Sequence, residues 1–228
     1  MGAGWYREGW RPPDFDGMDV AELTDAIIDD LVEGVGPSRI RAGVIGEIPA
    51  MDLSTDPDST DVRQLRAAAR ASARTGAAIT LHQWVGDGQD LEKTLDILEQ
   101  EGADLSRVIV GHIGGDAAGQ LPVLEAVLAR GATLQFDLLG APFLLEEPVD
   151  DTRGAVETIV TLTERGFARQ LMMSQDVCTK VQLKAYAGNG YDYILTQVVP
   201  YLQSRGVSDN DIETMLVQNP ARLFAIQD

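Results

Sequence analysis

The sequence predicts an α/β fold and, within that class, a (β/α)8 barrel. Three observations support this prediction. Short apolar runs alternate along the chain with segments of helical periodicity, glycine follows several of those segments, and each apolar run ends with a side chain that can bind a metal or move a proton. Strict alternation of strands and helices gives a parallel sheet with helical crossovers, which either stays open or closes into a barrel.

Five short apolar runs are predicted to be buried parallel strands, because they carry few polar residues along their length. They comprise residues 40–48, 77–82, 107–112, 132–137 and 169–176.

Five segments around these runs are predicted to be helices, because their apolar residues recur three and four positions apart. They comprise residues 20–35, 61–74, 90–101, 120–130 and 152–165. Glycine readily takes the left-handed conformation that ends a helix, and it follows four of them, at Gly76, Gly102, Gly131 and Gly166. The chain therefore contains five predicted βα units.

The polar residues at the strand ends favour a barrel over an open sheet. The active site of a barrel is built from the C-terminal ends of several strands, whereas an open sheet binds its ligand at one switch point, often with a glycine-rich phosphate loop. No such glycine-rich motif follows the first predicted strand.

Composition and charge limit the class of protein. The chain has 228 residues, of which 44% are apolar and 24% charged, and this predicts a single globular domain over residues 1–228. A net charge of −18 disfavours nucleic acids and acidic membranes as partners. No apolar run is long enough to span a membrane, and the lone Cys178 cannot form an internal disulfide. We therefore expect a cytoplasmic protein that binds neither nucleic acid nor membrane.

The candidate functional residues end the five predicted strands: Glu47, His82, His112, Asp137 and Asp176. The chain has only two histidines, and both occupy this position. Imidazole and carboxylate groups are the ligands of hydrolytic zinc, manganese or cobalt centres. We predict that Glu47, His82, His112 and Asp176 bind a divalent metal, with zinc preferred, and that Asp176 also accepts a proton from bound water.

These residues also have ordinary structural interpretations. A single histidine at a strand end is more often packed and hydrogen-bonded, and Asp137 is expected to cap a loop or helix. The alternative for Glu47 is a salt-bridged rim residue, which would need a cationic partner to offset its desolvation. Cys178 offers a different chemistry, that of a thiolate nucleophile. That alternative predicts inactivation by thiol alkylation and indifference to chelators.

Aromatic residues are frequent near the proposed strand ends, at Trp5, Tyr6, Trp10 and Trp84. They suit a hydrophobic substrate pocket and suit loop packing equally well. Residues 138–150 and 177–190 are expected to line the pocket, and the first of these loops is largely apolar. Tyr6, Trp84 and Lys180 are the candidate substrate-binding residues, and the apolar loop suits a small hydrophobic substrate.

Six segments of the sequence carry a further signal: residues 40–48, His82, Arg107–His112 (RVIVGH), Ser174–Lys184 (SQDVCTKVQLK), Gly188–Tyr193 (GNGYDY) and Asn219–Arg222 (NPAR). In this order they resemble the phosphotriesterase family of the amidohydrolase superfamily, and the match runs from Gly4 to the C-terminus. The resemblance implies a (β/α)8 barrel with two divalent metals, in which a metal-bound hydroxide attacks a phosphotriester, lactone or related ester.

The resemblance also assigns roles to single residues. His82 and His112 match the two histidines of the more exposed metal, and Asp176 matches the strand-eight aspartate that holds the other metal and takes the proton. Gly46 stands where the family usually has a bridging lysine, and Glu47 matches a glutamate used by one branch. Because neighbours in a strand face opposite ways, Glu47 serves this role only if the strand is locally twisted.

The chain departs from the family at its start, because the family's first-strand His-x-His pair is missing. We therefore expect an N-terminally incomplete barrel that lacks the first two to three βα units, roughly 70 to 90 residues. The expected function is that of a metal-dependent hydrolase of an ester-type bond. We expect two metals in a complete family member and one in this chain. A homodimer is compatible with this expectation. The activity of this chain itself stays open. The alternative is a non-catalytic barrel fragment that binds at most one metal ion.

Overall fold

The computed structural model describes residues 2–6, 9, 11–50, 53, 58–86, 88–140 and 152–225. Two compact units can be distinguished. Unit 1 comprises Met1–Gly111, Arg130–Ala132 and Ala221–Asp228, and unit 2 comprises His112–Ala129 and Thr133–Pro220. The predictions for Trp10 and for positions 141–150 of the first pocket loop fall outside the described residues.

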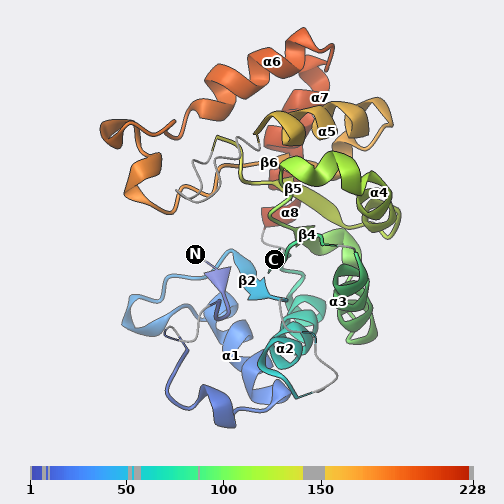
Figure 1. Cartoon of the computed structure of the whole chain (residues 1–228). Coiled ribbons are helices and arrows are strands. Elements are labelled where there is room, and N and C mark those ends of the chain that lie inside the picture. The colour runs from blue at the N-terminus through green and yellow to red at the C-terminus, as the bar shows by residue number, and fades with distance from the viewer. Residues whose placement is uncertain are drawn as a thin grey trace. The chain divides into compact units, whose positions relative to one another are not determined.

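Unit 1 contains four parallel strands that neighbour one another in chain order (Figure 1). These strands are β1 (Gly2–Ala3), β2 (Val44–Pro49), β3 (Ile79–His82) and β4 (Val108–Val110). The helices are α1 (Val20–Val32), α2 (Thr60–Thr75) and α3 (Gln89–Gln100). Helix α2 packs between α1 and α3 and also against β2, so that it covers the strands that carry Glu47 and His82.

Local sequence signals set the ends of the first two helices. Asp19 begins α1 with a capping box, in which its side chain accepts from the backbone of Glu22 and the Glu22 side chain accepts from Asp19. Helix α2 begins at the Ser59 cap and ends at Gly76, whose φ of 72° belongs to the left-handed region. The predicted glycine stop of this helix is therefore confirmed.

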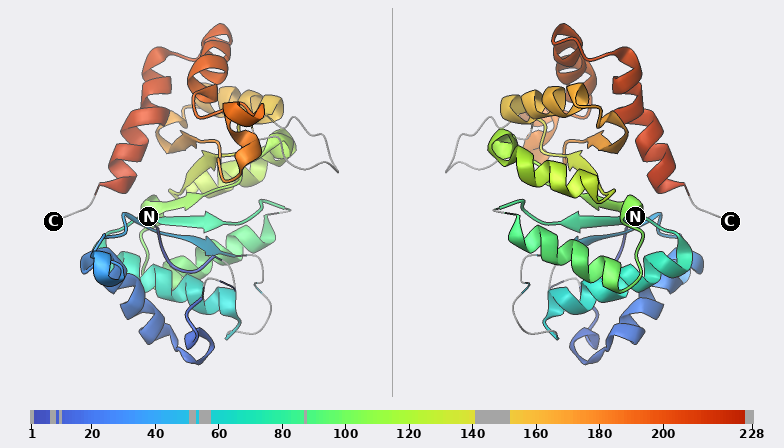
Figure 2. Two further views of the ribbon diagram at one scale, coloured as in Figure 1. Left: turned by 90° about the vertical axis from the view of Figure 1, so that its left-hand side faces the viewer. Right: turned by 90° about the vertical axis from the view of Figure 1, so that its right-hand side faces the viewer.

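Unit 2 contains the parallel pair β5 (Thr133–Phe136) and β6 (Leu171–Met173), in which Leu134 is opposite Leu171 and Phe136 is opposite Met173. Its helices are α4 (Leu121–Ala129), α5 (Thr152–Glu164), α6 (Val199–Ser204), α7 (Asp209–Glu213) and the start of α8 (Asn219–Phe224). Figure 2 shows α4 to α7 from two opposite sides. Helix α4 packs against β5, and the π-helical stretch Thr214–Gln218 packs against β6.

All five predicted strands and all five predicted helices are confirmed in type and order. The predicted bounds of the strands are corrected. All five strands are shorter than the apolar runs, and His112 and Asp176, which come after β4 and β6, have φ values of 56° and 41°, outside the extended region. The structure adds β1, which the sequence analysis missed. Among the described residues, no helix combines the length and apolar character that crossing a membrane requires.

Asn219 fixes the beginning of α8 to the entry of β6. Its side-chain amide donates to the carbonyl oxygens of Ala168 at 2.8 Å and Leu171 at 2.7 Å, and the residue is buried. Both carbonyl groups lie in a region that water does not reach freely, so the loss of their donor leaves them without compensation.

We predict that Asn219→Ala lowers the free energy of unfolding by about 3 kcal/mol, because two buried carbonyl groups lose their donor. The measurement is urea denaturation followed by circular dichroism. Asn210→Ala, at an exposed position of α7, is the control and should change stability by less than about 0.5 kcal/mol. Equal stability of the two variants would show that the Asn219 bonds contribute nothing.

Candidate active site

Strand β2 carries an irregularity at Gly46 and Glu47. Ile45 pairs with Ile79 of β3 and Ile48 pairs with Leu81, so β2 advances by three residues while β3 advances by two. Both isoleucines are completely buried, although strict alternation would put residues three apart on opposite faces. A bulge of this kind re-aims the side chain beside it. The local twist that Glu47 requires is therefore present.

Gly46 permits this irregularity because it has no side chain. Its φ is +131°, and a Cβ atom at this position would lie 2.5 Å from the carbonyl oxygen of Thr80. Any other residue would need both an unfavourable backbone conformation and a displacement of β3.

The bulge brings Glu47 to His82. The Glu47 Oε2 and His82 Nδ1 atoms are 3.5 Å apart, and the two side chains are 35% and 16% exposed, so solutes can reach them. The ring of Tyr6 lies over that of His82, with 4.3 Å between ring centroids and 58° between planes. Unit 1 thus brings together two predicted metal ligands and one predicted substrate-binding residue.

His112 and Asp137 form a buried pair in unit 2. Asp137 Oδ1 accepts from the His112 backbone N–H at 2.9 Å and lies 3.1 Å from His112 Nδ1, while Asp137 Oδ2 accepts from the Gln135 amide at 3.0 Å. A carboxylate only accepts, so the Nδ1 of His112 carries the proton and the ring is held in one orientation. The predicted cap role of Asp137 is corrected: it orients a histidine.

Asp176 follows β6 in a loop held by glutamine side chains. The Cys178 thiol lies 3.9 Å from Asp176 Oδ2, and the Gln182 amide donates to the Asp176 carbonyl oxygen at 2.7 Å. Lys180 begins the 3-10 turn Lys180–Gln182 and is exposed, and Trp84 follows β3 with 53% of its surface exposed. The sequence analysis did not find Gln135 in β5 or Gln182 in the turn after β6, since a hydrogen-bonding glutamine has no signature in periodicity.

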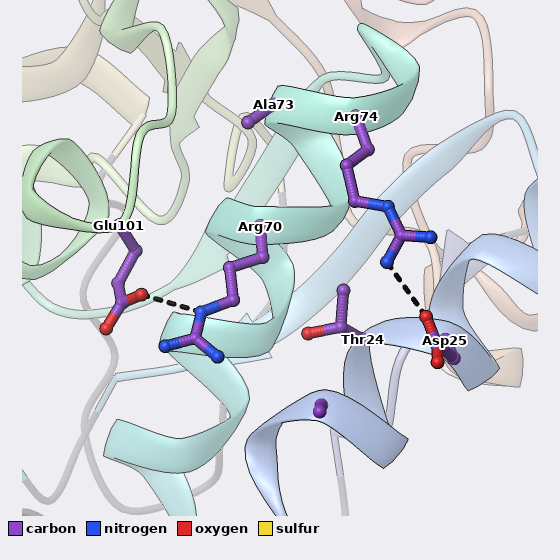
Figure 3. Close-up of a pocket in the computed structure, with 7 residues that line it drawn as sticks. Thr24, Asp25, Arg70, Ala73, Arg74 and Glu101 are labelled. Carbon is purple, nitrogen blue, oxygen red and sulfur yellow. Dashed lines mark hydrogen bonds and ion pairs between the residues drawn. The ribbon is translucent and has the colours of Figure 1, made fainter.

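A groove of 380 Å³ lies on the outer face of unit 1, between α1 and α2 (Figure 3). Arg70 and Arg74 of α2 point into it, and each guanidinium group is paired with a carboxylate, Glu101 at 2.7 Å and Asp25 at 2.8 Å. Its lining contains none of the predicted site residues. The groove therefore gives no support to a second catalytic centre.

The donor groups fit a divalent metal. Two ligand atoms of one tetrahedral zinc ion are about 3.3 Å apart, given bonds of roughly 2.0 Å. The 3.5 Å between the Glu47 oxygen and the His82 nitrogen is close to that separation. Glu47, His82 and His112 each offer one atom of a type that binds metal ions.

Parallel strands in chain order, with helices between them and imidazole and carboxylate groups near their C-terminal ends, are typical of (β/α)8 barrels, whose active sites lie at that end of the strands. The phosphotriesterase family model matches residues 1–224. The chain belongs to the phosphotriesterase family.

Individual relatives and solved structures agree with this assignment. The N-acetyltaurine hydrolase of Dictyostelium discoideum is 33% identical over 99% of the chain, and the chain spans 61% of its length. The phosphotriesterase homology protein of Escherichia coli is 33% identical, with 97% of the chain and 72% of the relative covered. Its crystal structure with phosphate in the active site has a TM-score of 0.81 at 30% identity, covering 97% of this chain and 73% of that one.

A third neighbour is a mutant of the phosphotriesterase-like lactonase of Deinococcus radiodurans. Its TM-score is 0.78 at 27% identity, over 97% of this chain and 71% of the neighbour. These neighbours confirm the predicted fold class, a (β/α)8 barrel of the metal-dependent hydrolase type, of which six strands are found in the described residues.

We predict that Gly46→Ala destabilises the protein by at least about 3 kcal/mol, because the new Cβ meets a backbone oxygen and φ is positive. Thermal unfolding measures this effect. Gly43→Ala, just before β2, is the control: a Cβ there has nothing within 4 Å, so it should melt like the parent protein. A Gly46→Ala protein as stable as the Gly43→Ala protein would contradict the described bulge.

Proposed function

We propose that the protein is a metal-dependent hydrolase of an ester-type bond in a small molecule, such as a lactone, phosphotriester or related ester. The observation that carries the proposal is the Glu47–His82 pair at zinc-ligand separation in a chain of the phosphotriesterase family. The contact between Asp137 and the His112 ring supports it, because a carboxylate that orients a metal-binding histidine is a usual feature of metal sites.

Each residue has a proposed role. His82, His112, Glu47 and Asp176 hold the metal, and Asp137 keeps His112 in the tautomer that can bind. A bound divalent metal would polarise the scissile bond and lower the pKa of water. Asp176 accepts the proton that water loses, and its partial exposure at the end of β6 gives it access to solvent. Tyr6, Trp84 and Lys180 contact the substrate.

Several finer points belong to the same proposal. Zinc is the preferred metal, with manganese and cobalt as alternatives, since imidazole and carboxylate ligands suit all three. The compartment is the cytoplasm, where the lone Cys178 stays reduced. The single domain over residues 1–228 and the homodimer also stay predictions.

A second candidate substrate class is an N-acyl amide. Relatives that are 29–33% identical to this chain are named N-acetyltaurine hydrolase, whose substrate name denotes an amide. An ester and an amide present the same carbonyl centre to an attacking water, so the ligand set serves either. The remaining alternative, a non-catalytic fragment that binds at most one ion, predicts metal binding without hydrolysis.

The proposal is tested by assaying the purified chain, supplied with zinc or manganese, against a lactone, a phosphotriester and N-acetyltaurine, with and without a chelator; hydrolysis that the chelator abolishes would support it. His82→Ala and His112→Ala should each lower the metal content, because removing one imidazole opens the site to water. Metal analysis after dialysis and an ester or amide assay check both points.

The control for this experiment is Asp14→Asn, an exposed carboxylate that caps no helix through its side chain. Unchanged metal content in both histidine variants would reject the site. Metal binding without hydrolysis would favour the non-catalytic alternative. Inactivation by thiol alkylation together with indifference to chelators would favour Cys178 as nucleophile.

We predict that Asp176→Asn retains metal comparatively well while turnover falls by about a hundredfold or more, the scale expected for loss of a general base. The amide keeps the shape of the side chain but cannot accept the proton. Steady-state kinetics with parallel metal analysis measure both quantities. A turnover close to that of the parent protein would remove Asp176 from the proposed mechanism.

A further inference from the structure

Gln182 is a buried amide that holds the loop carrying Asp176. The residue is 4% exposed. Its Oε1 atom accepts from the backbone N–H groups of Cys178 at 2.9 Å and Thr179 at 2.8 Å, and from the Thr179 hydroxyl at 2.9 Å. Three donors on one oxygen fold the residues after Asp176 back onto this side chain.

The other end of the same amide holds Asp176 itself. Gln182 Nε2 donates to the Asp176 carbonyl oxygen at 2.7 Å and lies 3.5 Å from the Gln175 carbonyl oxygen. Asp176 has a φ of 41°, in the left-handed region that non-glycine residues occupy only when their surroundings hold them there. Hydrogen bonds from one side chain therefore fix the backbone on both sides of the Asp176 carboxylate.

The C-terminal end of the loop also packs against Gln182. Gly190 N–H donates to the Gln182 carbonyl oxygen at 2.8 Å, and the Gln175 amide donates to the Gly190 carbonyl oxygen at 2.7 Å. A Cβ atom on Gly188 would lie 2.2 Å from the Gln182 carbonyl carbon, so only glycine fits there beside Gln182. The loop leaves Gln182 little room to take another position.

We propose that Gln182 is a positioning residue that sets the orientation of the Asp176 carboxylate toward the metal. The inference rests on the proposed function. Only an amide side chain offers the donor that Asp176 requires and the acceptor that Cys178 and Thr179 require, and it does so without burying a charge. Methionine has neither group, and glutamate keeps the acceptors but loses the donor.

The test is a double-mutant cycle between position 182 and Asp176. Gln182→Met is made in the parent protein and in Asp176→Ala, and Co²⁺ affinity is measured by visible absorption beside kcat for the hydrolysed substrate. If Gln182 acts through Asp176, Gln182→Met lowers Co²⁺ affinity about tenfold in the parent protein and has no further effect in Asp176→Ala. Gln203→Met, at an exposed glutamine of α6, is the matched control and should leave both readouts unchanged.

Equal losses of affinity in both backgrounds would assign Gln182 a merely structural role and overturn the proposal. If Gln182→Met does not fold, the cycle is run with Gln182→Glu, which retains the acceptors for Cys178 and Thr179. A parent protein that binds Co²⁺ but hydrolyses nothing contradicts the proposed function alone, and the Co²⁺ cycle still decides the role of Gln182. Absence of Co²⁺ binding in the parent protein would overturn both.

Discussion

One additional residue in β2 is the constraint on which the position of Glu47 depends. The strand buries Ile45 and Ile48 against Ile79 and Leu81, and each buried isoleucine stabilises the fold by roughly 2 kcal/mol. A regular strand would turn one of these side chains to the opposite face, away from this core, and lose that contribution. The irregularity is therefore maintained by the core, and Glu47, which contributes nothing to the core, is placed beside His82 as a consequence.

The order and type of the main elements could be predicted because they depend on local patterns. Apolar runs without a polar face form β2 to β6. Glycine ends a helix where the chain must take a positive φ, as at Gly76. Strand β1 could not be predicted, since two residues, Gly2 and Ala3, have no period. It exists because β2 offers an unpaired edge, which is a tertiary effect.

The candidate site was predictable to the extent that strand position determines it. Glu47 and His82 meet because parallel strands end at the same edge of a sheet, and that rule uses sequence position alone. The rule does not predict the role of Asp137. Its distance from His112 along the chain is 25 residues, and only the folded backbone shows that its carboxylate accepts from that histidine rather than capping a helix.

Hydrogen bonds to neutral amides support two of the proposed functional residues. In unit 2, the Gln135 amide donates to one oxygen of Asp137 while His112 contacts the other, so both carboxylate oxygens are engaged. Gln182 does the same for the backbone of Asp176. An amide can hold such groups without changing the local charge, whereas a lysine or arginine there would add a positive charge beside them. The negative charge of these residues is therefore not neutralised by the amides that hold them.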